Sequence, residues 1–105
     1  MGLKIFWTEF AKTELREIYQ FHLINVNGKV SKSIATKIVQ SVKILANQPE
    51  TGQREELLDG RQEQFRYIIS THYKVIYWIN KGKGQVEITD VFDTRQNPKK
   101  IQRFK

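Results

Sequence analysis

Four basic or titratable residues stand among strand-forming residues in the second half of the chain: Arg66, His72, Lys74 and Arg95. His72 titrates near neutrality and could serve as an acid or a base. Lys74, crowded by two arginines, could lose its proton more readily than a free lysine. The four residues are therefore candidates for a catalytic site. For His72 the alternative is a strand-end residue exposed to water, and for Lys74 it is a solvent-facing lysine of a sheet.

The residues around these candidates predict a sheet. Aromatic and β-branched residues dominate residues 64–70, 72–80 and 85–92, and Lys81–Gly84 reads as a glycine hairpin turn. Alternation along the strands predicts a wholly apolar face that carries three tyrosines, Tyr67, Tyr73 and Tyr77. It predicts an opposite face where the four candidates could gather, together with Trp78.

The first half of the chain predicts one strand and two helices. Residues 3–7 read as a strand, and Thr8 is placed to cap a helix of about four turns that frays near residues 25–28. A second helix is expected to start near Ser31 or Ser33 and to end before Pro49 and Gly52. Residues 51–63 read as a loop with a helical turn at 55–58. His22 falls on the first helix. A position on the helix surface or packing within the hairpin is a better explanation for this residue than a catalytic role.

The predicted fold class is α+β. An N-terminal strand, an antiparallel helix hairpin and a three-stranded antiparallel meander follow one another, and the helices cover one face of a four-stranded sheet. With 105 residues, 39% of them hydrophobic, the chain fits a single domain spanning residues 1–105.

Composition limits the chemistry that is available. There is no cysteine, and the two histidines are distant in sequence, which argues against a metal site and against disulfides. We expect no cofactor. No signal peptide or membrane span is recognisable, so the sequence predicts a cytoplasmic protein without membrane contact.

The net charge of +7 is concentrated at the C-terminus. Residues 95–105 hold no acid and five basic residues, namely Arg95, Lys99, Lys100, Arg103 and Lys105. Such a segment can meet nucleic-acid phosphates or an acidic protein partner, or it can be a solvated basic tail.

In the order of its elements and in two runs of residues, the chain resembles the RelE/ParE superfamily of bacterial type II toxin–antitoxin systems, often labelled plasmid stabilisation proteins. The runs are Tyr73–Tyr77 and the ending Val91–Pro98, which contains Arg95. The resemblance covers nearly the whole chain. It implies a compact toxin that is neutralised by a cognate antitoxin.

The superfamily contains two activities. RelE-like members cut messenger RNA on the ribosome without a metal, which requires a base, cations for the phosphate and an acid for the leaving oxygen. Lys74 and Arg95 match the arginines of the ribonucleases by position, and Arg66 matches a basic residue of the preceding strand more loosely. The RelE-type tyrosine would fall near Ile101, which can transfer no proton, and His72 or Lys74 would have to replace it.

ParE-like members poison DNA gyrase and so bind a protein rather than cut RNA. The short tail and the long helix hairpin resemble this class, and no catalytic set is then required. Five residues become binding candidates, for the antitoxin or for the target: Trp78, Arg95, Lys99, Lys100 and Arg103. Because the tyrosine is missing, we expect ParE-like inhibition of gyrase, with the ribonuclease as the alternative. A non-catalytic nucleic-acid-binding module is a third hypothesis, supported by the basic tail.

Overall fold

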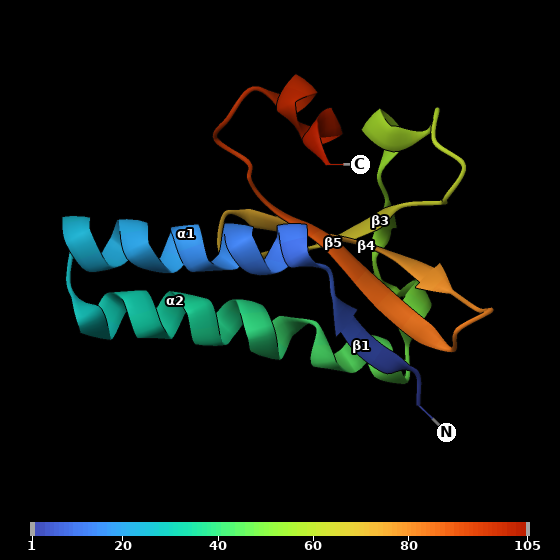
Figure 1. Cartoon of the computed structure of the whole chain (residues 1–105), viewed down its shortest axis with the longest axis horizontal. Helices are drawn as coiled ribbons and strands as arrows, with labels where there is room; N and C mark the ends of the chain where they lie inside the picture. The colour runs from blue at the N-terminus through green and yellow to red at the C-terminus, as the bar shows by residue number, and fades with distance from the viewer. Residues whose placement is uncertain (1, 105) are drawn as a thin grey trace.

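The computed structural model describes residues 2–104 and confirms the predicted α+β architecture (Figure 1). Two antiparallel helices, α1 (Glu9–Asn25) and α2 (Gly28–Ser41), cover one face of a sheet with the strand order β1-β5-β4-β3-β2. The meander consists of β3 (Arg66–Ser70), β4 (Tyr73–Asn80) and β5 (Gln85–Asp93). The N-terminal strand β1 (Lys4–Trp7) lies parallel to β5 and extends the sheet at one edge.

The sheet has five strands, one more than the sequence predicted. The additional strand, β2 (Gln53–Arg54), pairs antiparallel with β3 at the other edge of the sheet. Its two residues are polar and exposed, so they carry no alternation of apolar and polar residues that could reveal a strand. The helical turn that was expected in the same loop is present as η3 (Glu56–Leu58), a short 3₁₀ helix.

Side-chain caps explain where the helices begin. The Oγ1 atom of Thr8 accepts a hydrogen bond from the backbone N–H of Ala11, 3.2 Å away, as the sequence predicted. The second helix starts earlier than predicted, because Asn27 caps it by accepting a hydrogen bond from the N–H of Val30 at 2.9 Å. It also ends earlier, and two 3₁₀ turns follow it, η1 (Lys43–Ala46) and η2 (Pro49–Thr51).

Apolar side chains pack on both faces of the sheet. Between the sheet and the helices, Ile38 and Leu45 meet Val75 and Tyr77 in the larger core. On the opposite face the C-terminal segment, with η4 (Pro98–Arg103), folds back over the sheet. The buried side chains of this second core are Leu58, Phe65, Ile76, Phe92, Ile101 and Phe104. The C-terminal segment is therefore part of the fold and not a free basic tail.

A β-bulge at Thr89 changes which face the last strand presents. Ile76 pairs with Asp90 and Tyr77 pairs with Ile88, so Thr89 has no partner across the ladder. Its hydroxyl instead donates a hydrogen bond to the carbonyl oxygen of Ile76 at 3.1 Å. Beyond the bulge Asp90 points to the second core, and odd-numbered residues such as Val91 point to the helices.

The faces predicted for β3 were wrong. Tyr67 pairs with Ile76 and so shares the second face of the sheet, not the face beneath the helices. The cause is the tight turn at Thr71 and His72, which pairs Ser70 with Tyr73 and holds Thr71 at a φ of 54°. Alternation gives the faces within each strand, but the turn decides how the two patterns match.

None of the helices in residues 2–104 combines the length and the apolar character that a membrane crossing requires.

Candidate functional site

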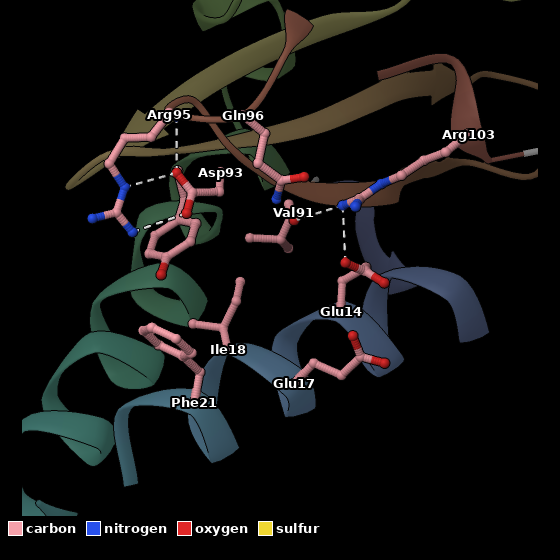
Figure 2. Close-up of a pocket in the computed structure, with 10 residues that line it drawn as sticks. Glu14, Glu17, Ile18, Phe21, Val91, Asp93, Arg95, Gln96 and Arg103 are labelled. Atoms are coloured by element: carbon pink, nitrogen blue, oxygen red, sulfur yellow. Dashed lines mark hydrogen bonds and ion pairs between the residues drawn. The ribbon is translucent and has the colours of Figure 1, made fainter. Parts of the chain in front are cut away.

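A pocket of about 280 Å³ lies between α1 and the end of β5 (Figure 2). Apolar and aromatic side chains form part of its wall, namely Ile18, Phe21, Tyr73 and Val91. Charged and polar side chains surround them, namely Glu14, Glu17, Asp93, Arg95, Gln96 and Arg103. A lining of this mixed kind suits the side chains of a protein partner.

An ion pair between Asp93 and Arg95 borders one side of the pocket. Arg95 donates to the carboxylate of Asp93 from Nη2 at 2.9 Å and from Nε at 3.1 Å, and its backbone N–H adds a third bond at 2.9 Å. These hydrogen bonds hold the pKa of Asp93 below its ordinary value. The Arg95 side chain remains 61% exposed, so the guanidinium is accessible to a partner although its charge is already paired.

A second ion network borders the opposite side and is centred on Arg103. Its guanidinium contacts Asp90 at 2.8 and 3.1 Å and Glu14 at 2.9 Å, so that it joins η4 to β5 and α1. Burial raises the pKa of Asp90, and the hydrogen bonds from Arg103 oppose that effect. Burial likewise raises the pKa of Glu14. Arg103, a predicted binding residue, thus already serves to hold the C-terminal segment in place.

Tyr73 and His22 form a buried polar contact beside the pocket. The Tyr73 hydroxyl and Nε2 of His22 share a hydrogen bond of 3.0 Å, and both residues are buried. Burial raises the pKa of Tyr73. His22 therefore takes part in packing between the helix hairpin and the sheet, whereas the sequence predicted packing within the hairpin or a position on the helix surface.

Lys74, the central cation of the predicted catalytic set, lies on the second face and is already paired. Its Nζ atom is 2.7 Å from Oε2 of Glu55, whose side chain is only 3% exposed. The same ammonium lies 4.2 Å from the centroid of the Tyr67 ring. Lys74 therefore fixes the loop that carries Glu55 to the sheet.

The other three candidates do not join Lys74. Arg66 pairs with Tyr77 on the helix side of the sheet, and its Nη1 atom donates to the carbonyl oxygen of Gly52 at 2.9 Å. Arg95 also lies on that side, beside the pocket. His72 occupies the turn between β3 and β4, and its buried Nε2 has no hydrogen-bond partner within the part of the chain that is described.

The prediction that these residues share one face was therefore wrong. Its physical reason is the pairing of Ser70 with Tyr73, which places Arg66 and Lys74 on opposite faces.

The remaining predicted binding residues differ in exposure. Trp78 is half-buried against the second core, whereas Lys99 and Lys100 are exposed on η4. Lys105 lies outside the described residues. Within residues 2–104 no group of three or more His, Asp and Glu side chains is placed to hold a metal ion.

Four carboxylates that position these cations were not singled out from the sequence: Glu14, Glu55, Asp90 and Asp93. A signal existed for Asp90, because it stands where the alternation set by Val86 and Ile88 calls for an apolar residue, and a buried carboxylate requires a partner. Taken together, the geometry supplies paired charges and an apolar wall, which suit binding better than proton transfer.

Residues 5–98 match the family model described as ParE toxin of type II toxin-antitoxin system, parDE. A search of curated proteins finds no match.

Two solved structures share the fold. A structure described as the chromosomal ParDE TA system from P. aeruginosa is 15% identical, with a TM-score of 0.72, over 88% of this chain and 96% of that one. The free state of an arginine-to-alanine variant of E. coli toxin RelE is 14% identical, with a TM-score of 0.58, over 89% of this chain and 84% of that one. The family match extends over most of the sequence, and the chain therefore belongs to the ParE toxin family of type II toxin–antitoxin systems.

Proposed function

We propose that this toxin acts by binding DNA gyrase, as a ParE-like inhibitor, and not by cutting messenger RNA. The observation that carries the proposal is the separation of Lys74 from Arg66 and Arg95 by the thickness of the sheet. Metal-independent RNA cleavage requires a base, a cation and an acid within reach of one phosphate. Residues on opposite faces of a sheet cannot meet that requirement together.

The charges of the candidate residues also favour binding over catalysis. Lys74 is neutralised by a nearly buried carboxylate, and Arg66 donates to backbone carbonyls. Ile101, near the position expected for the ribonuclease tyrosine, is completely buried in the second core. Neither proton transfer nor stabilisation of a developing phosphate charge is supplied by this arrangement.

Accessible cations remain for a protein partner. Arg95 borders the pocket. Lys99 and Lys100 are exposed on η4 and lie close to Arg95 in the sequence. Exposed arginine at the border of a partly apolar pocket is a frequent feature of protein interfaces. In our proposal these three residues contact the target.

The test is to induce the toxin in a bacterial host without its antitoxin and to follow two readouts in the same cultures. We expect DNA supercoiling to be disturbed with gyrase trapped on DNA, while ribosome-associated mRNA stays intact. A triple variant, Arg95→Ala/Lys99→Ala/Lys100→Ala, should lose the effect on gyrase. The matched control Lys81→Ala/Lys83→Ala also removes exposed cations, but on the turn between β4 and β5, and should retain it.

Two results would overturn the proposal. Cleaved mRNA with normal supercoiling would assign the chain to the RelE-like ribonucleases. Salt-dependent binding to bare RNA or DNA without growth arrest would favour the nucleic-acid-binding module.

A further inference from the structure

The side of α2 that points away from the core carries a row of lysines. Ser31 and Ile38 are buried on one side of this helix, and Val42 continues that side just after it. With about 3.6 residues per turn, the residues half a turn away lie on the opposite side, where they are polar and exposed. We call them the lysine face and define it by Lys29, Lys32, Thr36, Lys37, Gln40 and Lys43, the last of which begins η1.

The lysine face is one continuous surface. Its members follow one another at intervals of three or four residues, which places their side chains next to each other along the helix. Figure 1 shows α2 along one edge of the molecule, with α1 between it and the C-terminal segment. The acids Glu14 and Glu17 line the pocket between α1 and β5, so they lie on the side of α1 that faces away from α2.

The charges of the lysine face are not neutralised by the fold. Residues 18–49 contain no aspartate or glutamate. In the part of the chain that the structure describes, residues 2–104, none of the four lysines makes an ion pair. This differs from Lys74, Arg95 and Arg103, whose charges are already paired with carboxylates. Four ammonium groups are therefore available to an anionic partner.

We propose that the lysine face binds the phosphate backbone of duplex DNA independently of sequence. Lysine ammonium groups neutralise phosphates, and the side chains of Thr36 and Gln40 are suited to hydrogen bonds with phosphate oxygens. From Lys29 to Lys43 the chain rises by about 20 Å, if helical geometry is taken throughout. That length matches about six phosphates of one strand along the duplex axis.

The choice of DNA as the polyanion rests on the proposed function. Gyrase acts on duplex DNA, so a toxin bound to gyrase is close to the duplex that the enzyme holds. The lysine face then adds phosphate contacts to the complex, on a different side of the toxin from Arg95 and the pocket.

Other anionic partners fit the lysine face less well. Protein interfaces are depleted in lysine and enriched in aromatic residues and arginine, and α2 contains neither of the latter. The lack of an aromatic residue also disfavours a single strand, whose bases stack on such side chains. An anionic membrane requires the apolar side of an amphipathic helix, and in α2 that side is buried, with Val39 and Ile44 exposed only at the edges of the lysine face.

The test titrates a fluorescently labelled DNA duplex of mixed sequence with purified toxin and follows anisotropy. Raising the salt from about 50 to about 200 mM should weaken wild-type binding about 100-fold, as expected for four neutralised phosphates. Lys29→Gln/Lys32→Gln/Lys37→Gln should raise the Kd at the lower salt by about tenfold or more. The slope of log K against log salt should become shallower by about 2.7, because three phosphate contacts are lost.

The matched control is Lys4→Gln/Lys81→Gln/Lys83→Gln, which removes the same charge from three exposed lysines around the turn between β4 and β5. Lys4 belongs to this group because its backbone N–H donates to the carbonyl oxygen of Gly84 at 3.1 Å. The control should bind DNA nearly as wild type does. Both triple variants should keep the wild-type thermal midpoint, because the replaced side chains are exposed and glutamine has a helix propensity close to that of lysine.

Four results would overturn the proposal. They are the absence of wild-type binding to the duplex, equal weakening by the two triple variants, and tighter binding of the single strand than of the duplex. The fourth is a lysine-face variant that binds DNA as wild type does but binds the antitoxin more weakly, which would assign the face to an acidic protein. The assay contains no gyrase, so loss of the DNA contact and failure of the proposed target are told apart.

Discussion

Replacing Lys74 tests whether this residue is part of the fold or part of a catalytic site. Lys74→Met keeps the length of the side chain but leaves the carboxylate of Glu55, 3% exposed, without its cation. Breaking a buried ion pair from one side costs about 3–5 kcal/mol. Because Lys74 itself is 21% exposed and water can reach the pair, we expect the lower end, about 3 kcal/mol.

Urea unfolding measures this loss. With a slope of about 1.5–2 kcal/mol per M for a domain of this size, the midpoint should fall by about 1.5–2 M. The double variant Lys74→Met/Glu55→Gln removes both charges and keeps an acceptor for the backbone N–H of Leu57, which now lies 3.2 Å from Glu55 Oε1. It should recover most of the lost stability, because no buried charge is then left without a counter-charge.

The control is Lys81→Met, which removes an exposed lysine from the turn after β4 and should shift the midpoint only slightly. The reasoning is refuted if Lys74→Met is no less stable than this control, or if the double variant is as unstable as the single one. A Lys74→Met protein of normal stability that has lost mRNA cleavage would identify Lys74 as a catalytic residue.

Three further predictions concern packing, acid stability and the missing tyrosine. Gly52→Ala places a Cβ against the Tyr77 hydroxyl and should lower the free energy of unfolding by about 1–3 kcal/mol. Gly60→Ala, whose Cβ would meet no atom within 4 Å, should change the free energy of unfolding little. Equal effects of the two substitutions in urea unfolding would contradict the close contact between Gly52 and Tyr77. Asp93 has a lowered pKa, so its stabilising contribution is complete above the ordinary value of 3.8 and disappears as the pH falls through the lowered pKa. Asp93→Asn should therefore lose less thermal stability than wild type between about pH 5 and pH 2, and an equal loss would show that the ion pair does not contribute. Ile101→Tyr overfills a fully buried site, so it should destabilise by about 1–3 kcal/mol without creating RNA cleavage, and a stable variant that cleaves RNA would contradict this assignment.

The sequence was sufficient for elements whose signals are local. Thr8 as a helix cap and the alternation within β4 depend on residues a few positions apart, and both were predicted correctly. The faces of β3 could not be predicted in the same way, because they depend on the turn at Thr71. A shift of one residue in that turn exchanges the faces of Arg66 and Tyr67.

Apart from the pair Asp93–Arg95, the ion pairs of the candidate site were less predictable because their partners are distant in the chain. Glu55 lies 19 residues before Lys74, and Asp90 lies 13 residues before Arg103. The cations were visible as charges among apolar residues, but spacing alone gives no indication of which carboxylate each one meets. Only the folded chain distinguishes a cation that awaits a ligand from one that is already neutralised.

The bulge at Thr89 has a consequence for comparing this chain with its relatives. Because Thr89 is the residue left over between the pairs Tyr77–Ile88 and Ile76–Asp90, removing it would restore a regular strand with every later side chain still on its present face. Removing a residue elsewhere in β5 while the bulge remains would invert the faces of the residues on one side of the deletion. A homologue whose last strand is regular should therefore align with this chain through a one-residue gap at position 89. Because that gap lies inside a strand, an alignment that penalises gaps in secondary structure would place the counterparts of Asp90 and Asp93 one position away from their true positions.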